Sequence, residues 1–187
     1  MEIDQIIDGI YRLPQKSKAK IKESIVEVIY PKSHVLLKAN KIELQIYFIK
    51  RGIVRAYADR EDNQITFWFG KEGDTIISMK SYVEDKKGYE NIELLEECEL
   101  YQIQSERLKE LYNEDINIAN WGRKFSEQLL IQTEERLISR QFRSAPQRYK
   151  ELLDKTPHLI QRVQLSHIAS YLGITQVSLS RIRGTVK

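Results

Sequence analysis

The sequence predicts an α+β protein in which a β-rich N-terminal domain is followed by a helical part. Short apolar segments separated by turn residues recur from His34 to Ile103, a pattern typical of a sandwich, barrel or roll. No proline falls between Ser105 and Gln141, which permits long helices there. Two short helical segments joined at Gly173 follow near the end of the sequence. The expected parts are a β domain over residues 1–113, a long helix over 114–140 and a small helical domain over 141–187.

The β domain is expected to begin with a short helix and then a strand within residues 16–29, where a polar segment becomes β-branched. In the region that follows, side chains such as Ile65, Phe67 and Phe69 recur at every second position, as on one face of a strand. Glycines and polar runs separate these segments. The predicted strands are His34–Lys38, Ile46–Lys50, Ile53–Ala58, Gln64–Phe69, Thr75–Met79, Asn91–Leu95 and Glu99–Ile103.

The helical region is predicted to start with a capped short helix in SERLKELY and to continue as one long helix from Asp115 to Arg140. Such a helix would be about 39 Å long at about 1.5 Å per residue. Its apolar residues are spread too widely for a helix with one buried face. We expect one face to cover the β domain and another to meet a second copy of the chain, and the alternative is a helix packed wholly within its own chain. The expected dimer contacts are Ile118, Trp121, Phe125 and Leu129.

The last domain opens with a helix-start signal, in which Ser144 caps, Pro146 suits the first turn and Gln147 completes a capping box. Thr156-Pro157 is expected to end this helix. The segment from Leu165 onward then fits a helix-turn-helix, which needs a small residue where two helices touch and a residue tolerant of positive φ in the turn. Ala169 and Gly173 fill these two roles. The complete expected core is Ile168, Ala169, Leu172, Gly173, Ile174, Leu179 and Ile182.

The second helix of this pair presents an outward face without acidic residues, formed by Gln176, Val177, Ser180 and Arg181. Gln can pair with adenine and Arg with guanine through two hydrogen bonds, and Val can contact a thymine methyl group. These four residues are therefore the expected base-reading residues. The expected phosphate contacts are Thr175, which also suits an N-cap, and Ser178, Arg183 and Lys187. A plain helical hairpin without a nucleic-acid ligand is the alternative.

The charge distribution agrees with a polyanionic partner for the C-terminal part. From Arg143 to Lys187 there are eight Lys or Arg and two acids, which gives +6, and since the whole chain carries +3, residues 1–142 carry −3. A basic module on a mildly acidic body is expected where only the module binds nucleic acid. A basic surface that simply faces solvent is the alternative.

Three motifs together resemble the cyclic-AMP receptor/fumarate–nitrate regulator (Crp/Fnr) family of bacterial transcription factors. They are IASYLGITQVSLSRIR (168–183), YFIKRGIVRAYA (47–58) and WFGKEGD (68–74). The resemblance implies a double-stranded β-helix of the jelly-roll-like cyclic-nucleotide-binding type, a long dimerisation helix and a C-terminal helix-turn-helix domain on palindromic DNA, with RNA polymerase as a candidate partner. Because the sequence ends at Lys187, the family's β-hairpin wing is expected to be reduced or absent.

The resemblance also implies an effector pocket in the β-roll, for which Gly73, Asp74, Ile77 and Ile92 are the candidate residues. The family's cyclic-nucleotide binders hold the phosphate with an Arg-Ser/Thr pair, but this chain has Glu90-Asn91 there and no Arg between Glu72 and Gln104. A buried phosphate needs a compensating cation or a set of donors. Cyclic AMP and cyclic GMP are therefore not expected as effectors, and no other effector is identified. The alternative of an anion site at Lys80, Lys86 and Lys87 is weaker than that of a solvated loop.

Motifs for catalysis or metal binding are not found. The single cysteine, Cys98, excludes an internal disulfide and a cysteine-ligated iron–sulfur cluster, and it fits a reducing compartment. The three histidines, His34, His158 and His167, do not form a metal-binding spacing. Nucleophile-elbow, P-loop and dinucleotide-binding motifs are missing. We expect no enzyme activity, no metal and no bound cofactor, and a metalloenzyme is the weakest alternative.

These observations predict a homodimeric, sequence-specific DNA-binding transcription regulator that acts on a palindromic operator. The sequence shows neither a signal peptide nor an apolar run long enough for a bilayer, so the predicted location is the cytoplasm. The alternative is a ligand-binding or protein-interaction β-roll that no longer reads a specific operator.

Overall fold

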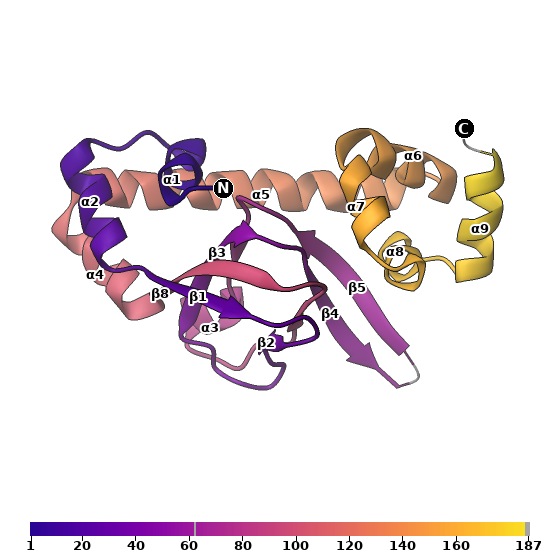
Figure 1. The fold of residues 1–187 in the computed structure, drawn as a ribbon, viewed down its shortest axis with the longest axis horizontal. Helices are drawn as coiled ribbons and strands as arrows, with labels where there is room; N and C mark the ends of the chain where they lie inside the picture. The colour runs from indigo at the N-terminus through magenta and orange to yellow at the C-terminus, as the bar shows by residue number, and fades with distance from the viewer. Residues whose placement is uncertain (62, 186–187) are drawn as a thin grey trace. The chain divides into compact units, whose positions relative to one another are not determined.

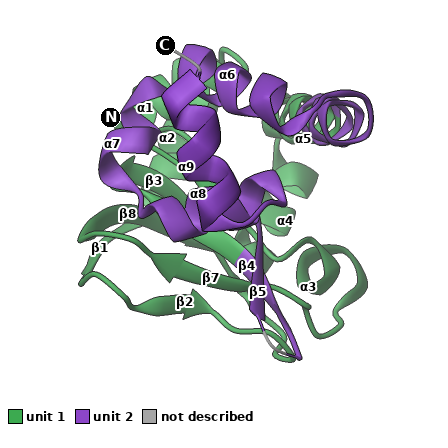
Figure 2. Cartoon of the chain, turned by 90° about the vertical axis from the view of Figure 1, so that its right-hand side faces the viewer, with its two compact units in different colours: residues 1–56, 69–130 green, residues 57–68, 131–187 purple. Residues whose placement is uncertain are grey.

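The computed structural model describes residues 1–61 and 63–185 of the chain, and its backbone forms two compact units. Unit 1 contains Met1–Ala56 and Phe69–Leu130, and unit 2 contains Tyr57–Trp68 and Ile131–Lys187 (Figure 2). The chain therefore passes between the units three times, twice along neighbouring β-strands and once within a long helix.

Unit 1 is built on two four-stranded sheets, ordered β1-β8-β3-β6 and β2-β7-β4-β5, with β4 and β5 continuing into unit 2 (Figure 1). In the first sheet, Ile46 lies opposite Ile103 and Val26 opposite Gln102. The strands are β1 (Val26–Tyr30), β2 (Val35–Leu37), β3 (Gln45–Arg51), β4 (Val54–Arg60), β5 (Asn63–Gly70), β6 (Thr75–Ile76), β7 (Asn91–Leu94) and β8 (Cys98–Gln104). All seven strands expected between His34 and Ile103 are present, although β6 is shorter than predicted because α3 (Met79–Glu84) begins there.

Gly52 shows why the turn between β3 and β4 requires glycine. Its φ of +121° is in a region that L side chains rarely adopt. A Cβ at this position would lie 2.3 Å from the Sγ of Cys98, which is fully buried. Backbone conformation and close packing therefore both exclude a side chain here.

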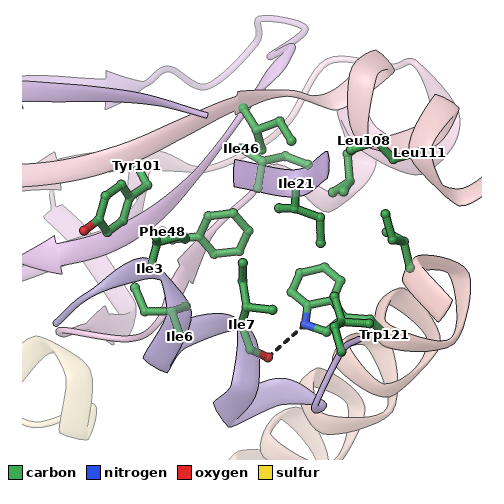
Figure 3. Close-up of a cluster of buried hydrophobic side chains, with 13 residues drawn as sticks. Ile3, Ile6, Ile7, Ile21, Ile46, Phe48, Tyr101, Leu108, Leu111 and Trp121 are labelled. Atoms are coloured by element: carbon green, nitrogen blue, oxygen red, sulfur yellow. Dashed lines mark hydrogen bonds between the residues drawn. The ribbon is translucent and has the colours of Figure 1, made fainter. Parts of the chain in front are cut away.

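Helices α1 (Ile3–Ile10), α2 (Gln15–Glu23), α4 (Ser105–Glu114) and the first half of α5 (Ile116–Phe142) complete unit 1. The sequence prediction missed α1, whose apolar residues Ile3, Ile6 and Ile7 are buried. Figure 3 shows these side chains in one cluster with Phe48 and Trp121. The Trp121 indole Nε1–H donates a hydrogen bond of 3.0 Å to the Ile7 carbonyl, which satisfies a polar group inside this core.

Unit 2 contains the β4–β5 hairpin segment, the second half of α5 and four shorter helices. These helices are α6 (Ala145–Lys155), α7 (Pro157–Arg162), α8 (Leu165–Leu172) and α9 (Gln176–Thr185). The predicted capping box is present before α6, where the Ser144 N–H donates to the Gln147 side chain at 2.8 Å. Glu151 on α6 accepts from the Ser139 hydroxyl at 2.8 Å and pairs with Arg143 at 2.6 Å, which fixes α6 against the end of α5. In the described part of the chain, no helix combines the length and the hydropathy that crossing a bilayer would require.

Candidate nucleic-acid interface and effector region

Helices α8 and α9 are joined by a turn whose geometry depends on Gly173. This residue has a φ of +68°, and the following Ile174 N–H donates back to the Ala169 carbonyl at 3.0 Å. That arrangement ends α8 with a left-handed residue, as many helices end. The small Ala169 is buried, as the close approach of two helices requires. Of the expected core residues, Ile168, Ala169, Leu172 and Leu179 are buried, whereas Ile174 and Ile182 are half-buried.

The N-terminus of α9 is capped by Thr175. Its Oγ1 accepts a hydrogen bond of 3.1 Å from the Ser178 N–H and lies 3.0 Å from the Ser178 hydroxyl. The other N–H groups of the first turn lack intrahelical partners, and helix N-termini attract anions. Thr175 is exposed and Ser178 half-buried, and Arg183 is exposed in the last turn. The fourth expected phosphate contact, Lys187, lies outside the described residues.

The four expected base-reading residues share one exposed face of α9. Gln176, Ser180 and Arg181 are exposed, and Val177 is 63% exposed. Val177, Ser180 and Arg181 follow Gln176 by one, four and five positions, which places the four residues on adjacent turns of a helix. None of the four side chains forms a hydrogen bond or ion pair with another described residue, so their polar groups are available to a ligand.

Two residues that the sequence analysis did not select hold α8 in place. The Arg148 guanidinium donates to the Leu172 carbonyl at 2.8 Å and also to the Arg143 carbonyl, and it thus links the C-terminal ends of α8 and α5. The Ser170 hydroxyl bonds to the β5 backbone. Both contacts join residues far apart in the sequence, so no local pattern could have indicated them.

The expected dimer contacts on α5 divide into two groups. Ile118 and Trp121 are fully buried in the core of unit 1, so the prediction that they meet a second copy was wrong. The cause is α1, which the sequence analysis missed and which covers this face of α5. Phe125 and Leu129 are half-buried and line an open groove of about 270 Å³.

This groove is mainly apolar. The α5 side of the groove includes the small residues Ala119 and Ser126, whereas Gly122 is buried. The Tyr112 ring packs directly on Gly122, where a Cβ would come within 2.6 Å of it, and burial raises the pKa of the Tyr112 phenol above its ordinary value. The complete lining is Ile46, Ile77, Met79, Tyr82, Leu108, Tyr112, Ala119, Gly122, Arg123, Phe125, Ser126 and Leu129.

Of the four candidate effector residues, three lie away from this groove. Gly73 and Asp74 belong to a turn in which the Asp74 carboxylate accepts the Lys71 N–H at 2.9 Å and Gly73 donates to the Ile49 carbonyl at 2.9 Å. Ile92 is buried on β7 and does not line the groove. Only Ile77 of the four lines it. The effector pocket expected from the resemblance stays a prediction, and this groove is a separate feature that shares only Ile77 with it.

A cyclic phosphate does not fit the residues of this region. Glu90, 8% exposed, holds its carboxylate against the Tyr89 N–H at 3.0 Å, where the family places an Arg. The buried cation of the roll, Arg55, pairs with Glu93 at 2.7 Å. A buried phosphate would meet the Glu90 charge and would have to compete with Glu93 for the guanidinium. Lys80, Lys86 and Lys87 are exposed, although Lys80 lies on α3 and not in the expected loop.

Metal-binding geometry is also not observed. Among residues 1–61 and 63–185 there is no group of three or more His, Cys, Asp or Glu side chains placed to hold a metal ion.

Comparisons with known proteins show which proteins share this architecture. Residues 27–115 match the cyclic nucleotide-binding domain family. FixK2 from Bradyrhizobium japonicum is similar in structure, with a TM-score of 0.74, 17% identity and coverage of 87% of this chain and 84% of that chain. A regulator from Eubacterium rectale described as Crp/Fnr family gives a TM-score of 0.72, 16% identity and coverage of 91% and 82%. CLP from Xanthomonas campestris gives a TM-score of 0.68 and 17% identity, with coverage of 92% of this chain and 91% of that chain.

No curated protein matches the chain in sequence. The resemblance predicted from the three sequence motifs is nevertheless confirmed at the level of the fold. The chain thus has the fold of the Crp/Fnr regulators, and its residues 27–115 are similar to the cyclic nucleotide-binding domain family.

Proposed function

We propose that this protein is a cytoplasmic transcription regulator that binds a palindromic operator as a homodimer. The observation that carries the proposal is the exposed, acid-free face of α9 formed by Gln176, Val177, Ser180 and Arg181. Gln and Arg can each make two hydrogen bonds to one purine in the major groove, and this is how proteins distinguish adenine from guanine there. The adjacent helix α8 forms hydrogen bonds to α6 through Arg148 and to β5 through Ser170. These bonds restrict the movement of α8, and with it that of α9.

Phosphate contacts would come from the beginning and end of the same helix. The α9 N-terminus with Thr175 and Ser178, together with Arg183, supplies backbone donors, hydroxyl groups and a cation. Each phosphate neutralised releases a condensed counterion, so affinity should fall steeply as salt concentration rises.

Two features of α5 support a homodimer. The groove at Phe125 and Leu129 offers an apolar surface beside small residues. Further along the helix, Leu130 is 70% exposed and Leu137 56% exposed, seven positions apart. A spacing of seven places both on one stripe, as in paired helices of a coiled coil. Two recognition helices in such a dimer would read half-sites about 34 Å apart.

DNA recognition is tested by selecting binders from a pool of randomised double-stranded DNA. We expect one enriched palindrome, which the Gln176→Ala/Arg181→Ala variant does not enrich. Lys150→Ala is the matched control, because Lys150 is an exposed cation on α6 outside the reading face. Failure of the wild-type chain to enrich any sequence would exclude operator recognition.

Dimer formation is tested by sedimentation equilibrium. Leu137→Glu should shift the protein toward the monomer, because a charge would face the partner helix. Val26→Glu is the control, since Val26 is 62% exposed on β1. If both variants sediment as the wild type does, α5 is not the dimer interface.

The second candidate function is that of a β-roll that binds a ligand or a protein and reads no specific operator. The residues covered by the family match favour it. That match covers residues 27–115 only, which exclude α8 and α9. This candidate predicts no enriched DNA sequence and a small molecule or partner protein retained by the purified chain, which native mass spectrometry would detect. RNA polymerase is a proposed partner only if the protein is a transcription regulator, in which case the two would meet on DNA.

A further inference from the structure

The Ser170 hydroxyl connects the β4–β5 hairpin to α8 within unit 2. The Thr66 N–H donates to the Ser170 Oγ at 2.9 Å, and the Ser170 hydroxyl donates to the Gln64 carbonyl at 2.8 Å. β5 is the last strand of its sheet, and edge strands present alternate N–H and C=O groups outward. The Ser170 hydroxyl accepts and donates as one residue of a neighbouring strand would.

The position of Ser170 on α8 makes this contact separate from the packing of α8 against α9. Ile168, Ala169 and Leu172 form the buried side of α8. At about 100° per residue, Ser170 projects roughly opposite to that side. Helix α8 is therefore held by α9 on one face and by the hairpin on the other.

The contact is buried at its Thr66 end only, because Gln64 and its bond to Ser170 are exposed. Thr66 is fully buried, at 0% exposure. Without the Ser170 hydroxyl, the Thr66 N–H would lose its acceptor. A buried donor without a partner costs more free energy than a hydrogen bond that water can replace.

We propose that Ser170 is a positioning residue, through which the β4–β5 hairpin holds α8 and thereby orients α9 for DNA reading. The docked hairpin contacts α8 and leaves Gln176, Val177 and Arg181 exposed. Docking therefore supports the reading face without covering it. This inference rests on the proposed DNA-binding function.

The test compares Ser170→Ala, Ser170→Thr and the control Ser166→Ala. Ser166 is exposed on the same helix, and its side chain bonds to no other described residue. Two quantities are measured, namely the exchange rate of the Thr66 amide by NMR and the dissociation constant for the selected operator. Ser170→Ala should speed the exchange by at least about fivefold, which is about 1 kcal/mol. It should also weaken operator binding by about three- to fivefold, and Ser170→Thr, which keeps the hydroxyl, should restore both values.

Each other result overturns the inference. Unchanged exchange in Ser170→Ala would show that the hydroxyl does not hold the hairpin. If the Thr66 amide exchanges faster in Ser170→Ala but operator affinity is unchanged, the contact has a structural role only. If Ser170→Ala binds the operator more tightly, the contact opposes DNA binding. A wild-type chain that selects no operator would end the proposed function itself, and the positioning role with it, whereas the first three results arise in a protein that still binds its operator.

Discussion

Gly173 is the residue on which the α8–α9 turn depends, and replacing it with alanine gives a clean measure of that dependence. At φ +68°, an L-residue pays a conformational penalty of about 1–2 kcal/mol. A Cβ at this position would meet its nearest heavy atom, the Arg140 Nη2, only at 4.0 Å, so no clash adds to the penalty. Reduced freedom of the unfolded chain offsets about 0.4–1 kcal/mol. We therefore expect Gly173→Ala to destabilise unit 2 by about 1 kcal/mol.

The assay is urea unfolding followed by helical circular dichroism, together with amide exchange in α8. Gly173→Asn should cost less, because Asn tolerates the left-handed region better than Ala does. Gly184→Ala is the control, since Gly184 lies within α9 with open space around it, and alanine there should stabilise the helix by up to about 1 kcal/mol. A loss above about 3 kcal/mol in Gly173→Ala would reveal a steric clash, and no loss at all would refute the left-handed turn.

Four further predictions follow from contacts described above. Arg181→Ala should weaken operator binding by about 1–3 kcal/mol and relax the preference at one base pair, and an equal loss on random DNA in a filter-binding assay would assign Arg181 to phosphate instead. Trp121→Phe should lower the unfolding free energy by about 2–3 kcal/mol, since it removes the donor to the Ile7 carbonyl and leaves a void, and a loss below about 0.5 kcal/mol in urea unfolding would contradict this burial. The Lys20 and Ser17 hydrogen bonds lower the pKa of Asp115 to about 2, below its unfolded value of 3.8, so its stabilisation is present above pH 4 and is lost as the pH falls toward 2. The stability difference between wild type and Asp115→Asn should therefore shrink over that interval, and a constant difference in unfolding experiments at pH 2–5 would refute the assignment. Cyclic AMP should give no binding heat in calorimetry at pH 7, and micromolar affinity would show that Glu90 does not exclude the phosphate.

Local signals in the sequence predicted several helix ends, although α1, α3 and α7 were not predicted. The Ser144–Gln147 capping box, the left-handed Gly173 and the Thr175 cap each depend on residues within four positions, and the structure has all three. The alternating segments likewise predicted the seven strands between His34 and Ile103, because side-chain periodicity reports directly on burial.

The errors arose where packing between distant segments decides the outcome. The Ile3, Ile6, Ile7 spacing was a helical signal that the sequence analysis passed over, and α1 then covered the side of α5 that carries Ile118 and Trp121. Pairs such as Arg55 with Glu93, 38 positions apart, and Ser170 with Gln64, 106 positions apart, have no local signature. They could not be predicted from one sequence, because many polar residues compete for the same partners.

The burial of Cys98 has a practical consequence. As the only thiol of the chain, at 0% exposure and packed against Gly52, it should react with an aromatic disulfide reagent only when the roll opens. The rate of thiol labelling in native buffer thus reports the opening of unit 1, with no engineered probe. For the same reason, a cysteine introduced on the surface, for instance at exposed Lys150, can carry a spin label or dye alone while the native thiol stays unmodified.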